Sequence, residues 1–207
     1  PLQACVREHL AADGSFFVNI KAHAEDGQRH LYVFDLVAAH ARRWSWFFKD
    51  DLVRFKRSMP GEWPDRFRND WEPVFHFAPS KAIKFRPMNV VHESDACRSY
   101  APNGGRTFGG NIGIGDIGHV SGLARPGNVI EISTRENPDG NAHSAAFPPR
   151  LPEFFVKAFS DAGDLVVDPF LGSGSTLIAA AKTGRVARGF EISPRYCDVI
   201  RRRWTKY

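Results

Sequence analysis

The chain has 207 residues, of which 43% are hydrophobic, and a formal net charge of +5. This length and composition are enough for one sizeable hydrophobic core. No apolar run is long enough to span a bilayer, and we expect neither a signal peptide nor a membrane partner. The three cysteines, Cys5, Cys97 and Cys197, are too few and too widely spaced for a disulfide framework or a zinc site. We therefore expect a cytoplasmic protein without a bound metal.

Helical and strand patterns alternate along the chain. Helical patterns cover residues 2–10, the first part of 31–48, and 151–159. Strand patterns cover residues 14–20, the end of 31–48, and then 52–56, 74–77, 129–133, 165–170 and 186–192. Such alternation predicts an α/β fold with three layers around a mostly parallel sheet.

Residues 40–86 carry the excess of positive charge. This segment has eleven Lys and Arg against six Asp and Glu, a difference of +5 that equals the net charge of the chain. Aromatic residues from Trp44 to Trp71 are interleaved with them. Basic side chains neutralise phosphates and aromatic rings stack on unpaired bases, so the segment is compatible with nucleic-acid binding. The alternative is a core of aromatic side chains beneath a solvated basic face, and charge alone does not separate the two.

Residues 99–127 are rich in glycine. A stretch of this length without a secondary-structure pattern is usually functional or disordered. It either orders on DNA, or it is a surface excursion without contacts to bases, and we favour the first. Arg98, Arg106 and Arg125 are then the candidates for contacts with guanine edges or phosphates.

The segment Asp168–Thr176 is the most informative part of the chain. It joins the apolar run 165–167 to a helical pattern that begins at Leu177, so it predicts a strand, a glycine-rich turn and a helix N-terminus. Gly172 and Gly174 allow the backbone to approach a ligand closely. The turn matches neither a G-x-G-x-x-G dinucleotide fingerprint nor a phosphate-binding P-loop, which requires a lysine. A ligand that has a ribose but no phosphate is therefore expected.

The following strand supplies an acidic residue, Glu191, twenty-three positions after Asp168. In nucleotide-binding folds an acid at about this offset binds ribose hydroxyl groups. The alternative, an ordinary strand–turn–helix with small residues for packing, does not account for this acid.

These motifs resemble those of a known family. The sequences DPFLGSGST from Asp168 and GFEISPRY from Gly189 are similar to the S-adenosylmethionine motifs of bacterial and phage DNA amino-methyltransferases. The closest likeness is to the branch in which the cofactor motif follows the catalytic motif. Phe147 and Pro148 lie in a stretch that resembles a further cofactor motif, H-P-A-x-F-P, although its first residues here are His143 and Ser144. Residues 14–19 and 56–77 also resemble family segments.

The resemblance implies one methyltransferase domain with a Rossmann-like, three-layer, mostly parallel sheet that is incomplete at its N-terminus. Residues 1–85 would belong to the catalytic part of the core, 86–141 would be the target-recognition region, and 142–207 would bind S-adenosylmethionine. It further implies transfer of a methyl group to an exocyclic amine of a flipped base in double-stranded DNA, with N6 of adenine preferred over N4 of cytosine. A partner restriction endonuclease is compatible with this interpretation but not required by it.

The catalytic tetrapeptide of the family, Asp/Asn/Ser-Pro-Pro-aromatic, is absent from the sequence. Its single Pro-Pro pair, Pro148-Pro149, follows Phe147 and belongs to the cofactor motif. We therefore expect a fragment of a longer enzyme that is inactive by itself, and no catalytic residue is assigned. Because the family places the tetrapeptide on the strand next to the cofactor strand, we also expect the strand at 165–170 to have an unpaired edge. The alternative is a non-catalytic module that binds S-adenosylmethionine and DNA.

The resemblance assigns site residues by position. Asp168 would lie beside the methionine ammonium group, Glu191 would bind the ribose, and Ser173, Ser175 and Thr176 would bind the cofactor carboxylate or cap the helix. The expected cofactor-binding residues are Phe147, Pro148, Asp168, Pro169, Phe170, Gly172, Ser173, Gly174, Ser175, Thr176 and Glu191. The expected nucleic-acid-binding residues are Arg57, Arg66, Arg68 and Arg106.

Overall fold

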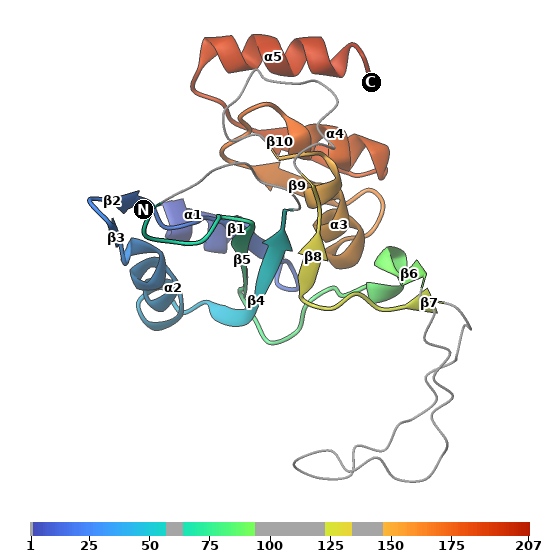
Figure 1. Cartoon of the computed structure of the whole chain (residues 1–207). Coiled ribbons are helices and arrows are strands. Elements are labelled where there is room, and N and C mark those ends of the chain that lie inside the picture. Colours follow the sequence, from blue (N-terminus) through green and yellow to red (C-terminus); the bar gives the residue numbers. More distant parts are fainter. Residues whose placement is uncertain (1, 57–63, 94–122, 134–146) are drawn as a thin grey trace.

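A computed structural model describes residues 2–56, 64–93, 123–133 and 147–207 (Figure 1). A four-stranded sheet has the order β1-β5-β4-β8. Its strands are β1 (Phe16–Asn19), β5 (Trp71–Ala78), β4 (Phe47–Phe55) and β8 (Val129–Glu131). A second sheet consists of the parallel pair β9 (Leu165–Asp168) and β10 (Val186–Gly189). Two short antiparallel pairs complete the described strands: β2 (Ala24–Glu25) with β3 (Gln28–Arg29), and β6 (His92–Glu93) with β7 (Leu123–Ala124).

Helices and strands alternate in the last part of the chain, from α3 to α5, whereas β1 to β3 and β4 to β5 follow one another without a helix between them. The helices are α1 (Leu2–His9), α2 (Tyr32–Arg42), α3 (Arg150–Phe159), α4 (Ser175–Lys182) and α5 (Pro194–Trp204), with a short 3₁₀ helix η1 (Pro87–Val90). The sequence interpretation missed α5, because its run of polar and basic residues has only a narrow apolar face. Within the described residues, no helix is both long and apolar enough to cross a membrane.

The α/β class is confirmed, but the four-stranded sheet is mixed. β4 pairs with β8 in parallel, whereas β1 and β4 both pair antiparallel with β5. β4 and β5 follow each other in the chain and meet at Phe55 and Trp71, so they run in opposite directions as the two arms of one hairpin. The strand β8 also joins this core sheet, although residues 86–141 were expected to form a separate target-recognition region. That division of the chain remains a prediction.

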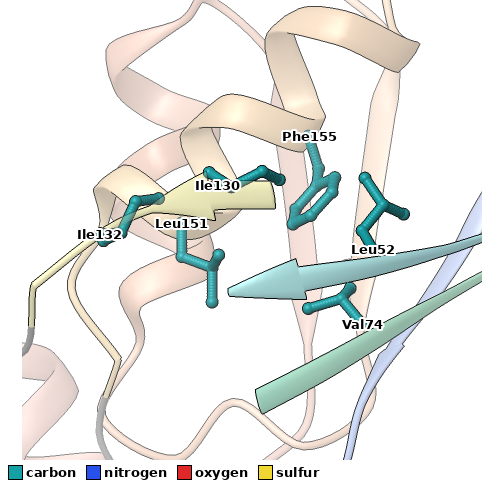
Figure 2. Packing of buried hydrophobic residues seen from close by; sticks show 6 residues of the cluster. All are labelled: Leu52, Val74, Ile130, Ile132, Leu151 and Phe155. Carbon is teal, nitrogen blue, oxygen red and sulfur yellow. The ribbon is translucent and has the colours of Figure 1, made fainter. Parts of the chain in front are cut away.

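Helix α3 packs on the four-stranded sheet through one hydrophobic cluster. Its side chains Leu151 and Phe155 pack on Leu52, Val74 and Ile130 of the four-stranded sheet and on Ile132, which directly follows β8 (Figure 2). In β1, the ring of Phe17 lies 4.5 Å from that of Phe155. The amphipathic spacing of α3 leaves its other side for α4, the helix that follows β9. Packing on α3 therefore positions the β9–β10 sheet relative to the four-stranded sheet.

The opposite face of the four-stranded sheet packs on α1 and α2. Val33, Trp46, Phe75 and Phe77 form this second cluster, and the ring of His40 stacks on Phe77 with 4.4 Å between ring centroids. Helices thus cover both faces of this sheet, which gives the three layers that the sequence predicted.

One edge of β9 has no strand beside it among the described residues, where β9 pairs only with β10. The expected unpaired edge is therefore present in the part of the chain that the structure describes.

The histidine His76 in β5 is buried, stacked on Phe17 at 4.4 Å, and within hydrogen-bond distance of the Ser15 hydroxyl at 2.9 Å. Burial, with a smaller contribution from Lys49, lowers the pKa of His76 to about 4. Because protonation is then easier in the unfolded chain, the folded state should lose stability as the pH falls from about 6.5 through 4.

Thermal unfolding measured across this pH range tests the prediction. The variant His76→Gln keeps a hydrogen-bonding group but does not titrate, so its melting temperature should depend less on pH than that of the wild type. His92→Gln, at an exposed position in β6, should keep the wild-type slope. A wild-type slope in His76→Gln would contradict the assignment.

Candidate functional site

A cavity of about 670 Å³ opens beyond the carboxyl ends of β9 and β10. These strands are parallel, with Asp168 opposite Gly189, so the segments that leave them converge at one edge of the sheet. The volume lies within the range of about 300–1,000 Å³ typical of small-molecule sites. The lining residues are Phe147, Pro169, Phe170, Leu171, Gly172, Ser173, Ser175, Phe190, Glu191, Ile192 and Tyr196.

Two glycines shape the turn between β9 and α4. Gly172 and Gly174 have φ values of 53° and 82°, in the left-handed region that other residues rarely adopt. Gly172 lines the cavity, as expected, but Gly174 does not. Instead, a Cβ atom at Gly174 would lie 3.0 Å from Cγ1 of Ile200 in α5. Gly174 therefore allows the turn to pack closely on α5, and the expected approach of its backbone to a ligand remains a prediction.

The carboxylate of Glu191 organises one side of the cavity. Its Oε2 accepts a hydrogen bond from the Gly172 amide at 2.8 Å, and its Oε1 accepts one from the Ser193 amide at 2.8 Å. Each carboxylate oxygen can accept a second hydrogen bond, so Glu191 can also accept hydroxyl donors of a ligand. It thus holds the turn and lines the cavity at the same time.

The carboxylate of Asp168 has a different place. It accepts hydrogen bonds from the Phe170 amide at 2.9 Å and from the Thr176 hydroxyl at 2.6 Å, and neither Asp168 nor Thr176 lines the cavity. Asp168 therefore stabilises the conformation of the turn. The expected contact of Asp168 with a ligand ammonium group remains a prediction. Thr176 makes this bond to Asp168 and provides no helix cap.

A hydrogen bond from Ser175 holds a segment that is distant in sequence against the cavity. The Ser175 hydroxyl donates to the carbonyl oxygen of Phe147 at 2.7 Å, across 28 positions of sequence. Phe147 lines the cavity, whereas its neighbour Pro148 is fully buried and does not. The resemblance placed both residues near the cofactor, and the structure brings Phe147 to the wall.

Seven of the eleven expected cofactor residues line the cavity, and Asp168, Gly174, Thr176 and Pro148 do not. The sequence interpretation missed four lining residues: Leu171, Phe190, Ile192 and Tyr196. Phe190 and Ile192 flank Glu191, so their position in the chain was an available signal. Tyr196 depends on α5, which the sequence interpretation did not predict.

The basic segment divides into buried and exposed residues. The side chains of Arg54 and Lys56 are buried and bind the carboxylate of Glu72, with N···O distances of 3.0 and 2.7 Å. Burial by itself raises the pKa of Glu72, but Lys56 and Arg54 outweigh it and the net shift is downward. These two residues therefore belong to a structural ion-pair cluster, which also shows that Glu72 pairs with basic neighbours.

Of the expected nucleic-acid-binding residues, Arg66 is half-buried and Arg68 is exposed. Arg57 and Arg106 lie outside the described residues, as does Arg98. Arg125, between β7 and β8, is exposed. Near Arg68, the side chain of Asn69 accepts a hydrogen bond from Arg29 of the β2–β3 hairpin at 2.7 Å. Contact between these arginines and DNA remains a prediction.

Comparison with known proteins identifies the family. Residues 3–202 match the profile of the DNA methylase family (N6_N4_Mtase). The chain belongs to this family. It is 28% identical over 222 aligned residues to the type II methyltransferase M.PvuII of Proteus hauseri, an alignment that covers 92% of the chain and 65% of M.PvuII. It is 45% identical over 65 residues to the orphan methyltransferase M.BamHII of Bacillus amyloliquefaciens, covering 31% of the chain and 24% of M.BamHII. The chain thus spans less than two thirds of either relative.

Solved structures of DNA methyltransferases share the fold. The PvuII DNA methyltransferase (cytosine-N4-specific) superposes with a TM-score of 0.74 at 24% identity, over 98% of this chain and 68% of that one. The M1.HpyAVI–SAM complex superposes with a TM-score of 0.66 at 18% identity, over 98% of this chain and 79% of that one. These likenesses confirm the Rossmann-like α/β fold class.

Substitution of two glycines tests the packing of the turn. Gly163 and Gly174 both have left-handed φ values, but a Cβ atom would meet nothing within 4 Å at Gly163, whereas it would press on Ile200 at Gly174. We expect Gly163→Ala to lower the free energy of unfolding by about 1 kcal/mol. Gly174→Ala should cost more, because Ile200 must also move. Equal losses in chemical denaturation would show that the contact with Ile200 is unimportant.

Proposed function

We propose that this protein is an S-adenosylmethionine-dependent DNA methyltransferase that methylates an exocyclic amine of a base. The observation that carries the proposal is the cavity at the carboxyl ends of β9 and β10, with Glu191 on its wall. Membership of the DNA methylase family supports it independently.

The composition of the cavity fits a cofactor with a ribose, an adenine and no phosphate. None of the described lining residues is Lys or Arg, so the lining offers no cation to a triphosphate. Phe170, Phe190 and Ile192 are exposed apolar side chains on its wall, suited to an adenine ring. Glu191 has lone pairs left for two ribose hydroxyls. The N-terminus of α4 at Ser175 favours an anionic group such as the methionine carboxylate.

For methyl transfer, the residues around the cavity mainly have to position the cofactor. When bound, S-adenosylmethionine supplies an electrophilic methyl group on its sulfonium sulfur. The chain would bind this group and orient it toward the target amine. The target amine has to leave the base stack to reach the methyl group, so the DNA partner is a duplex with a flipped base. The exposed Arg68 and half-buried Arg66 are candidates for its phosphates.

The identity of the target base needs a correction. The resemblance led us to prefer N6 of adenine, but no comparison supports that preference, and the PvuII enzyme of similar fold is cytosine-N4-specific. The proposal therefore covers both amines, and N4 of cytosine is the first to test.

The catalytic tetrapeptide would lie beside β9. The edge of β9 that has no partner strand among the described residues supports a further strand at this position, which would carry the tetrapeptide that the sequence lacks. On this proposal the chain is inactive without that strand. The second candidate function is a non-catalytic module that binds S-adenosylmethionine and DNA, and the sequence feature that favours it is the absence of a Pro-Pro-aromatic tetrapeptide.

Transfer of labelled methyl groups tests the function. The complete gene product, incubated with tritiated S-adenosylmethionine, should label double-stranded DNA and not RNA, and nucleoside analysis should show N4-methylcytosine or N6-methyladenine. Residues 1–207 alone should bind the cofactor and leave DNA unlabelled. Cofactor binding without transfer by the complete gene product would support the non-catalytic module instead.

Charge-neutral substitutions test the assignment of the acids. Glu191→Gln should weaken S-adenosylmethionine binding about tenfold or more, and Asp168→Asn less, because Asp168 acts through the turn and Glu191 lines the cavity. DNA affinity should change little in both variants. Calorimetric titration with the cofactor measures the effect, and Asp198→Asn, at an exposed ion pair with Arg201, is the matched control. Wild-type cofactor affinity in both variants would refute the site.

A further inference from the structure

Three consecutive arginines close helix α5, and only the last of them faces inward. Arg201 and Arg202 are exposed, whereas Arg203 is 7% exposed. One guanidinium nitrogen of Arg203 donates to the carbonyl oxygen of Ser173 at 2.6 Å and to its hydroxyl at 2.8 Å. The same nitrogen lies 3.3 Å from the Ser175 hydroxyl. A side chain thirty positions away in sequence therefore holds the glycine-rich turn.

The acceptors of Arg203 belong to the cavity wall, although Arg203 does not. Ser173 and Ser175 both line the cavity, and Ser175 passes the connection on through its hydrogen bond to the carbonyl oxygen of Phe147, a third lining residue. Helix α5, the turn and the segment before α3 are thus joined by a continuous set of hydrogen bonds that begins at Arg203.

The turn needs such support because its backbone is unusual. Gly172 and Gly174, on either side of Ser173, have positive φ values, and glycine loses more conformational freedom on ordering than any other residue. A site that is held in its binding conformation before the ligand arrives avoids this loss on binding. Burial of a guanidinium group is itself unfavourable without hydrogen bonds, and one nitrogen of Arg203 makes its hydrogen bonds to the turn.

We propose that Arg203 is a positioning residue of the cofactor site, which fixes Ser173 and Ser175 in the conformation that S-adenosylmethionine binds. This inference rests on the proposed function, because it takes the cavity to be the cofactor site. In this proposal Arg203 acts on the cofactor through Ser173 and Ser175 and makes no contact with the methyl group or the DNA.

The experiment compares Arg203→Met with Arg202→Met. The first variant removes the hydrogen-bond donors and keeps most of the side-chain volume, and the second changes an exposed arginine of the same helix, α5. Calorimetry should show S-adenosylmethionine binding weakened at least tenfold in Arg203→Met and changed less than twofold in Arg202→Met. Arg203→Lys, which keeps one charged donor group, should recover part of the loss. In the complete gene product, the KM for the cofactor should rise while kcat at saturating cofactor stays within about twofold, a split that general destabilisation would not produce.

A double-mutant cycle keeps the test decisive if Arg203→Met fails to fold. Ser173→Ala should weaken cofactor binding, and the loss in Ser173→Ala combined with Arg203→Lys should be smaller than the product of the two single losses, because both act on one contact. Unchanged cofactor affinity in Arg203→Met, or independent losses in the cycle, would overturn the inference about Arg203. If the wild type still bound the cofactor, the proposed function would stand. A wild type that did not bind the cofactor would overturn both.

Discussion

The parallel register of β9 and β10 is the constraint on which the site depends. With Asp168 opposite Gly189, the two strands end together, and the turn after β9 meets Glu191 after β10. The hydrogen bond between the Gly172 amide and Glu191 joins the two segments directly. A shift of the register would separate them, so the cavity exists only because two strands of modest length pair in one alignment.

The site also depends on α3, although no residue of this helix lines the cavity. This helix packs on the four-stranded sheet through Leu151 and Phe155 and on α4 through its other side. It begins directly after Phe147–Pro149, so the helix that joins the two sheets also delivers Phe147 to the cavity wall. Among the described residues, no strand lies between the two sheets, and the contact of α3 with α4 links them instead.

Charge in this chain serves two separate purposes. The ion pairs of Arg54 and Lys56 with Glu72, and the hydrogen bonds of Arg203 with the turn, bury positive charge where it holds the backbone in place. Arg68 leaves its charge at the surface, where long-range attraction to phosphates operates. A count of basic residues along the sequence does not distinguish these two groups, because burial is a property of the packed elements.

The sequence by itself determined the strand–turn–helix at Asp168–Thr176, the acid that follows it, the α/β class and the family. These depend on local patterns: hydrophobic periodicity, glycine where φ is positive, and the spacing from Asp168 to Glu191. The tertiary structure alone decided that Gly174 faces Ile200, that Asp168 fixes the turn, and that Tyr196 lines the cavity. It also brought Arg203 to Ser173, because a contact across thirty positions arises only when separate elements pack together.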